Sequence, residues 1–122
     1  MTDWLEVSNP ARGTVLAHRC RVARSLRDRT VGLLGTSEVG PGDGLWIERS
    51  PSIHMFFMRY AIDVVFVDDA ARVIRVVDRL RPWRIVAWVR GARDCLELPA
   101  GSVGPTGTVA GDVLATRAVR GE

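Results

Sequence analysis

The segment Ile53–Asp69, with the sequence IHMFFMRYAIDVVFVDD, constrains the fold most because it sets a few charged residues inside an almost wholly apolar run. Asp63 stands between Ile62 and Val64 in this run. Burying an ionised carboxylate costs several kcal/mol unless another group pairs with it. The pattern therefore indicates either a buried structural network or the floor of a binding site.

Short runs rich in β-branched and aromatic residues recur along the chain and predict strands. The expected strands are Thr2–Val7, Val15–Cys20, Leu45–Glu48, Ile53–Met58, Ile62–Val67, Arg72–Val77, Ile85–Val89, Cys95–Leu98 and Val113–Val119. The segment Asp68–Ala71 predicts a four-residue hairpin loop, and a short helix is expected from Ser25 to Gly35. These elements predict a mainly β fold, a β-sandwich or partly open barrel with one short helix packed at one side.

A chain of 122 residues suits one domain with a single core, so we expect residues 1–122 to form one domain. Its 47% hydrophobic and 25% charged residues are typical of soluble globular proteins. The longest apolar runs fall short of the roughly 20 residues that a membrane-spanning helix needs. The first residues lack the basic and apolar regions of a signal peptide, and we therefore expect a cytoplasmic protein.

The net charge of +3 and the pI of about 9.6 raise the question of nucleic-acid binding. All 17 basic residues are arginines, and acidic residues stand close to many of them, as in Arg27-Asp28-Arg29 and Asp78-Arg79. Interspersed charges of both signs are typical of an ordinary solvated surface. The charge pattern therefore argues against a nucleic-acid partner and leaves an unknown small molecule or protein as the expected partner.

Two widely separated cysteines, Cys20 and Cys95, predict free buried thiols in a reducing compartment. His18 would share a strand face with Cys20, and His54 with Cys95 would complete a formal set of two histidines and two cysteines. None of these residues has the close spacing of a zinc-ligand pair. We therefore expect no metal and no other cofactor.

Three separated motifs bear on the family of the chain. They are Arg29–Gly35 (RTVGLLG), His54–Asp68 (HMFFMRYAIDVVFVD) and Leu96–Gly101 (LELPAG), the last followed at a distance by Gly111-Asp112. In order and spacing, over about residues 12–115, they resemble the bacterial and archaeal family called domain of unknown function 192. The resemblance implies a small β-rich fold with a helix packed to one side, and it implies no established activity.

The chain departs from the common pattern of that family at three positions. Met55 stands where a small hydroxyl residue is usual, Phe57 where glycine is usual, and Ala61 where proline is usual. If this strip lines a pocket, Met55 and Phe57 would make the pocket narrower and more apolar.

The polar residues of these motifs allow two interpretations. In the structural one, Arg59 and nearby backbone N–H groups hold Asp63 and lock the start of the hairpin. In the other, His54, Arg59, Asp63 and Glu97 form the rim of a shallow cleft, where His54 could shuttle protons and Arg59 could hold an anionic group. Glu97 alternates with two leucines, so it could instead simply face solvent.

The chain contains four tryptophans, Trp4, Trp46, Trp83 and Trp88. Core packing is the simplest account of Trp46 and Trp88. Trp83 lies in the polar context Arg81-Pro82-Trp83-Arg84 and is the best candidate for exposure.

The leading functional hypothesis is a non-enzymatic accessory or binding domain. Its candidate binding cleft consists of His54, Arg59, Asp63, Glu97 and Trp83. The alternative is a small hydrolase or isomerase that uses His54 and a carboxylate as acid and base, although the sequence offers no convincing nucleophile. A purely structural oligomerisation module is a third class.

Overall fold

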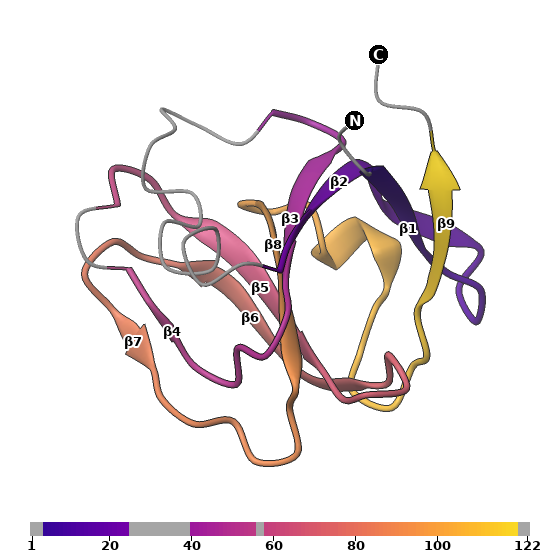
Figure 1. Ribbon diagram of the computed structural model, residues 1–122. Coiled ribbons are helices and arrows are strands. Elements are labelled where there is room, and N and C mark those ends of the chain that lie inside the picture. Colours follow the sequence, from indigo (N-terminus) through magenta and orange to yellow (C-terminus); the bar gives the residue numbers. More distant parts are fainter. Residues whose placement is uncertain (1–3, 25–39, 56–57, 120–122) are drawn as a thin grey trace.

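The computed structural model describes residues 4–24, 40–55 and 58–119, which form nine strands and one 3₁₀ helix (Figure 1). The elements are β1 (Trp4–Asn9), β2 (Thr14–Ala23), β3 (Asp43–Ile47), β4 (Ile53–His54), β5 (Ile62–Val67), β6 (Val73–Leu80), β7 (Ile85–Val86), β8 (Asp94–Pro99), η1 (Gly104–Thr106) and β9 (Ala115–Val119). The predicted mainly β fold is confirmed. The helix expected from Ser25 to Gly35 lies outside the described residues. Within those residues, no helix has the length and apolar character to cross a bilayer.

Seven of the strands form one mixed sheet in the order β6-β5-β8-β3-β2-β1-β9. Only the β2–β3 pair is parallel among these pairs, and the others are antiparallel. A bridge between Arg72 and Val113 joins the chain just before β6 to the chain just before β9. The two edge strands of the sheet thus approach each other at one end, and the curled sheet stays open because no continuous ladder joins them.

In the hairpin of β5 and β6, β5 follows the sequence pattern closely, whereas β6 ends at Leu80 rather than at the predicted Val77. The bounds of β5 are those predicted, and all of its residues are buried, as expected for a strand covered on both faces. The loop is Asp68–Arg72, one residue longer than predicted, since Arg72 pairs with Val113. The Asp68 side chain accepts hydrogen bonds from the N–H groups of Ala70 and Arg72 at 2.9 Å and so holds this loop.

The two faces of the curled sheet carry separate apolar cores. The first core lies between one face and the small β4–β7 sheet, and it contains Ile62, Val64 and Phe66 of β5. The second core lies on the other face and contains Val65 and Val67. Both faces of β5 are therefore covered, which explains why its apolar residues are continuous rather than alternating.

The small sheet is shorter than the sequence predicts. Strand pairing is limited to Ile53–His54 and Ile85–Val86, whereas Ile53–Met58 and Ile85–Val89 were expected. Trp83 has a φ of 68° before β7, and Trp88 has a φ of 45° after it. A left-handed residue departs from extended strand geometry, and the pairing of β7 lies between these two residues.

Candidate functional site

Asp63 is fully buried in β5, where three backbone N–H groups bind its carboxylate. Oδ1 accepts from Arg79 at 2.8 Å and from Gly101 at 3.0 Å, and Oδ2 accepts from Val103 at 2.9 Å. Backbone donors satisfy a buried carboxylate without any need for a counter-ion. One side chain thus ties β5 to β6 and to the loop after β8, and this geometry favours the structural interpretation of Asp63.

The backbone around Asp63 departs from a regular ladder to deliver these donors. The β5–β6 register shifts between Ile62 and Val64, and Arg79 takes a φ of 52° opposite this shift. Gly101 has a φ of 83°, and a Cβ there would lie 3.0 Å from Nη2 of Arg79. The left-handed φ favours glycine here, and the N–H of Gly101 in the LELPAG motif reaches the carboxylate in this conformation.

Arg59 is exposed, and no ion pair between Arg59 and Asp63 occurs among the described residues. The pairing that the sequence suggested is replaced by the backbone donors. The backbone N–H groups of the structural interpretation are present, and strand and loop geometry supply them without Arg59.

Glu97 is buried in β8, with 5% of its surface exposed, so the prediction that it faces solvent is wrong. It pairs with Leu45 of β3 on one side and with Val64 of β5 on the other. No hydrogen bond joins its carboxyl group to any described residue. Desolvation raises the pKa of Glu97 to about 8, which keeps the carboxyl largely protonated at neutral pH.

The structure separates the two carboxyl groups of the predicted cleft. Asp63 pairs with Leu98, whose side chain belongs to the second core, while Glu97 pairs with Val64, whose side chain belongs to the first. Side chains at directly paired positions point to the same face of a sheet. Asp63 and Glu97 therefore point to opposite faces and do not share a cleft.

His54 and Trp83, in contrast, come together in the segment that carries the small sheet. We call residues 51–55 and 81–90 the β4–β7 arm. His54 is paired with Ile85, and the N–H of Trp83 donates to the carbonyl of Met55 at 2.7 Å. Ser52 accepts a hydrogen bond from the N–H of Trp88 at 2.7 Å through its Oγ. Figure 1 shows β7 at the outer edge of the molecule, far from both termini.

The arm exposes three large apolar side chains. The exposed fractions are 58% for Trp83, 57% for Ile85 and 77% for Trp88. The prediction that Trp83 is exposed is confirmed, and the prediction that Trp88 belongs to the core is wrong. Trp46, predicted to be in the core, is buried and donates its indole N–H to Asp94 at 3.1 Å.

Sequence reasoning missed Ile85 and Trp88 because it treated Ile85–Val89 as one strand. Val86 and Val89 are buried, and the three-residue spacing between them breaks the alternation of a strand. The sequence does not show this spacing, because every residue of Ile85–Val89 is apolar. The arginines on both sides of the segment were the available signal that it is not a core strand.

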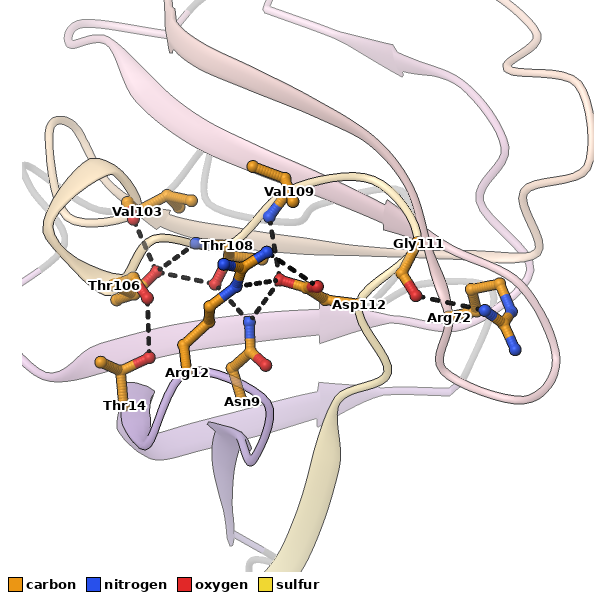
Figure 2. Close-up of polar contacts among 10 residues, drawn as sticks. All are labelled: Asn9, Arg12, Thr14, Arg72, Val103, Thr106, Thr108, Val109, Gly111 and Asp112. Atoms are coloured by element: carbon orange, nitrogen blue, oxygen red, sulfur yellow. Dashed lines mark hydrogen bonds and ion pairs between the residues drawn. The ribbon is translucent and has the colours of Figure 1, made fainter.

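A second polar cluster lies at the turn between β1 and β2 and contacts the chain around η1 and before β9 (Figure 2). Asp112 Oδ2 accepts from Asn9 Nδ2 at 3.0 Å, from Arg12 Nε at 3.1 Å and from Val109 N at 3.2 Å. These donors, chiefly Arg12, lower the pKa of Asp112 to about 2. Asn9 Nδ2 also donates to Thr108. Asn9 Oδ1 is buried and has no hydrogen-bond partner among the described residues. The other contacts link the β1–β2 turn to the chain before β9, and we assign the cluster a structural role in attaching this chain to the sheet.

The two cysteines are free and buried. Burial raises the pKa of Cys20 to about 12 and raises the pKa of Cys95 even further, so neither thiol ionises near neutral pH. The described residues contain no group of three or more His, Cys, Asp and Glu side chains that could hold a metal ion. The thiols therefore act as core side chains in this arrangement.

Comparisons with known proteins identify related sequences over most of the chain. The family model DUF192, described as an uncharacterized ACR, matches residues 7–116. A UPF0127 protein of Thermococcus sibiricus is 32% identical over 113 residues, and the match covers 87% of this chain and 71% of that protein. A UPF0127 protein of Pyrococcus horikoshii is 48% identical over 50 residues, 41% of this chain and 43% of that protein.

Two solved structures share the fold. A protein of unknown function from Novosphingobium aromaticivorans matches with a TM-score of 0.75 and 21% identity, covering 92% of this chain and 83% of that one. A protein from Sinorhizobium meliloti, described as a proposed transcription regulator, matches with a TM-score of 0.81 and 19% identity. The match covers 95% of this chain and 94% of that one. Identities this low show the common fold alone.

Proposed function

The chain belongs to the DUF192 family, and we propose that it is a non-enzymatic domain that binds a partner through the β4–β7 arm. The observation that carries this proposal is the exposure of Trp83, Ile85 and Trp88 within one short segment. Single exposed apolar residues are ordinary, but a cluster of large ones is typical of an interaction surface.

The backbone of the arm supports the same proposal. Trp83 and Trp88 both have a positive φ, which costs a bulky residue roughly 1–3 kcal/mol. Their side chains recover little of this free energy by burial, since both are mostly exposed. Strained residues of this kind cluster at ligand clamps and other functional sites.

The enzymatic alternative, a small hydrolase or isomerase, has one observation in its favour. Glu97 has a pKa raised to about 8, and perturbed carboxyl groups are frequent in active sites. However, β4 turns Ile53 toward the first core and His54 toward solvent. His54 and Glu97 then lie on different sides of β4, which does not suit a pair that must act on one substrate. We therefore favour the binding function.

A cytoplasmic location is consistent with the proposal. Two thiols that stay unpaired are typical of proteins in reducing compartments.

The proposal is tested by oxidative footprinting of the tryptophans in cells that natively express the protein. We expect Trp83 and Trp88 to be oxidised more slowly in cells than in the purified protein, because a bound partner covers the arm. Trp4 lies on β1 of the main sheet and serves as the internal reference. Equal oxidation of Trp83 and Trp88 in cells and in buffer, relative to Trp4, would show that the arm has no partner.

A thermal melt separates a binding role from a folding role. The double variant Trp83→Asn/Trp88→Asn places asparagine at both positions, and asparagine tolerates a left-handed backbone. We expect its Tm to equal or exceed that of the wild type, because it loses little buried surface and relieves strain. A Tm several degrees lower would mean that the tryptophans serve folding, and the binding proposal would fail.

A further inference from the structure

The charge of the β4–β7 arm indicates the chemistry of its partner, and we propose that the arm docks on a lipid bilayer containing anionic phospholipids. This inference rests on the proposed function, because it names the partner of the same surface.

The arginines of the chain are not evenly distributed with respect to the arm. The arm contains three arginines, Arg81, Arg84 and Arg90, and no acidic residue. The whole chain has a net charge of +3, so the remainder of the chain carries 3 − 3 = 0. Outside the arm, charges of both signs are interspersed and balance, whereas the arm with its exposed tryptophans carries positive charge alone.

The arm combines large exposed apolar side chains with exposed arginines. Arg81, Arg84 and Arg90 are exposed, and they flank the exposed Trp83, Ile85 and Trp88 in the chain. Indole rings favour the headgroup level of a bilayer. An aliphatic side chain lowers the free energy of binding when it moves from water to the boundary between headgroups and acyl chains. Guanidinium groups meanwhile bind phosphate, and each basic residue near an anionic surface adds to the affinity.

The same groups fit a single-stranded nucleic acid less well. Binding of that kind requires aromatic rings on which bases stack and a basic groove that follows the backbone. Ile85 offers no ring, yet it is exposed between the two tryptophans. The small sheet lies at the outer edge of the molecule (Figure 1), and a projecting edge suits a flat bilayer.

The test is co-sedimentation of the full chain with vesicles. We expect binding to vesicles of phosphatidylcholine with phosphatidylglycerol, little binding to vesicles of phosphatidylcholine alone, and weaker binding as the salt concentration rises. With the wild-type protein, phospholipids brominated on their acyl chains should quench tryptophan fluorescence. Equal binding to both kinds of vesicle, or no quenching, would overturn the inference without any appeal to a variant.

Paired variants assign the binding to the arm. Arg84→Gln/Arg90→Gln should weaken the partition onto anionic vesicles about 30-fold. The matched control Arg21→Gln/Arg75→Gln removes the same charge from exposed positions on β2 and β6. This control should weaken the partition onto anionic vesicles much less. Trp83→Asn/Trp88→Asn should weaken it about tenfold or more. Equal losses in the arm and control variants would contradict docking by the arm.

The remaining outcomes distinguish this inference from the proposed function. If Trp83 and Trp88 are protected in cells but anionic vesicles do not bind the protein, the arm has another partner and only the lipid inference fails. Arm-dependent binding of an oligothymidylate or an oligoglutamate probe, with no vesicle binding, would identify that partner as nucleic acid or acidic peptide. If the tryptophans are unprotected in cells, the proposed function fails as well.

Discussion

At the scale of single residues, the protein buries two carboxyl groups in two different ways. Three backbone N–H groups satisfy Asp63, while Glu97 lies between apolar strands with a pKa of about 8. An ionised carboxylate can be buried when hydrogen bonds replace its hydration, and otherwise the group takes up a proton. The sequence places both in β-forming runs, so only their surroundings distinguish them.

We predict that Asp63→Ala lowers the free energy of unfolding by roughly 3 kcal/mol or more, because three buried N–H groups would lose their acceptor. Urea unfolding at neutral pH measures the change. The control is Asp69→Ala in the exposed hairpin loop, which should change stability by less than about 0.5 kcal/mol. Similar losses in the two variants would contradict a structural role for Asp63.

We predict that stability decreases as the pH rises from about 4.5 to about 8, owing to Glu97. The folded-state pKa of about 8 lies above the ordinary value of 4.5, so the folded state binds the proton more tightly than the unfolded state. The stabilisation is complete below pH 4.5 and is lost as the pH rises through the folded pKa.

Urea unfolding of wild type and Glu97→Gln across this range measures the effect. Over this rise in pH, the free energy of unfolding of the wild type should fall by on the order of a few kcal/mol relative to that of the variant, because the amide of the variant does not titrate. Parallel curves for the two proteins would show that Glu97 ionises normally in the folded state.

At the scale of elements, one side-chain cluster and one backbone bridge hold the two ends of the sheet in place. The Asp112 cluster joins the β1–β2 turn to the chain before β9, and the Arg72–Val113 bridge joins that chain to β6. Edge strands have unsatisfied backbone groups along one side. The cluster and the bridge position one edge of the curled sheet near the other.

We predict that Asp112→Asn lowers the Tm at neutral pH and has little effect near pH 2. The pKa of Asp112 is lowered to about 2, so its stabilising contribution is present above the ordinary value of 3.8 and is lost as the pH falls through about 2. Thermal melts of both proteins at several pH values measure the difference in Tm. A difference that does not shrink on acidification would exclude the carboxylate charge as its cause.

At the scale of the whole molecule, the curled sheet separates two cores, each with one buried cysteine. Cys95 belongs to the first core and Cys20 to the second. Because the strands that carry the two cores are shared, we expect both cores to unfold together.

Pulsed alkylation with iodoacetamide tests this expectation. In native buffer neither thiol should react, since both are buried and their pKa values are raised. In increasing urea, Cys20 and Cys95 should become modified at the same concentration, as measured by mass spectrometry. Modification of Cys95 before Cys20 would show that the core beneath the arm opens on its own.

Much of the architecture was predictable from local pattern. The continuous apolar run Val64–Val67 indicates a strand covered on both faces, and β5 has the predicted bounds Ile62–Val67. Most residues of β5 are β-branched, and such residues suit an extended backbone. The motifs around it predicted the family, and the mainly β fold followed from the number of such runs. The exposure of Trp83 was also predictable, because arginines and a proline surround it.

The composition of the site depended on tertiary contacts instead. The burial of Glu97, the exposure of Trp88 and the separation of Asp63 from Glu97 all follow from how the sheet curls and what covers each face. Alternation along a strand assigns side chains to two faces, but it does not say which face is covered by other parts of the chain. That covering depends on contacts between residues distant in sequence, such as those between β4 and β7, and the local pattern of residues does not specify them.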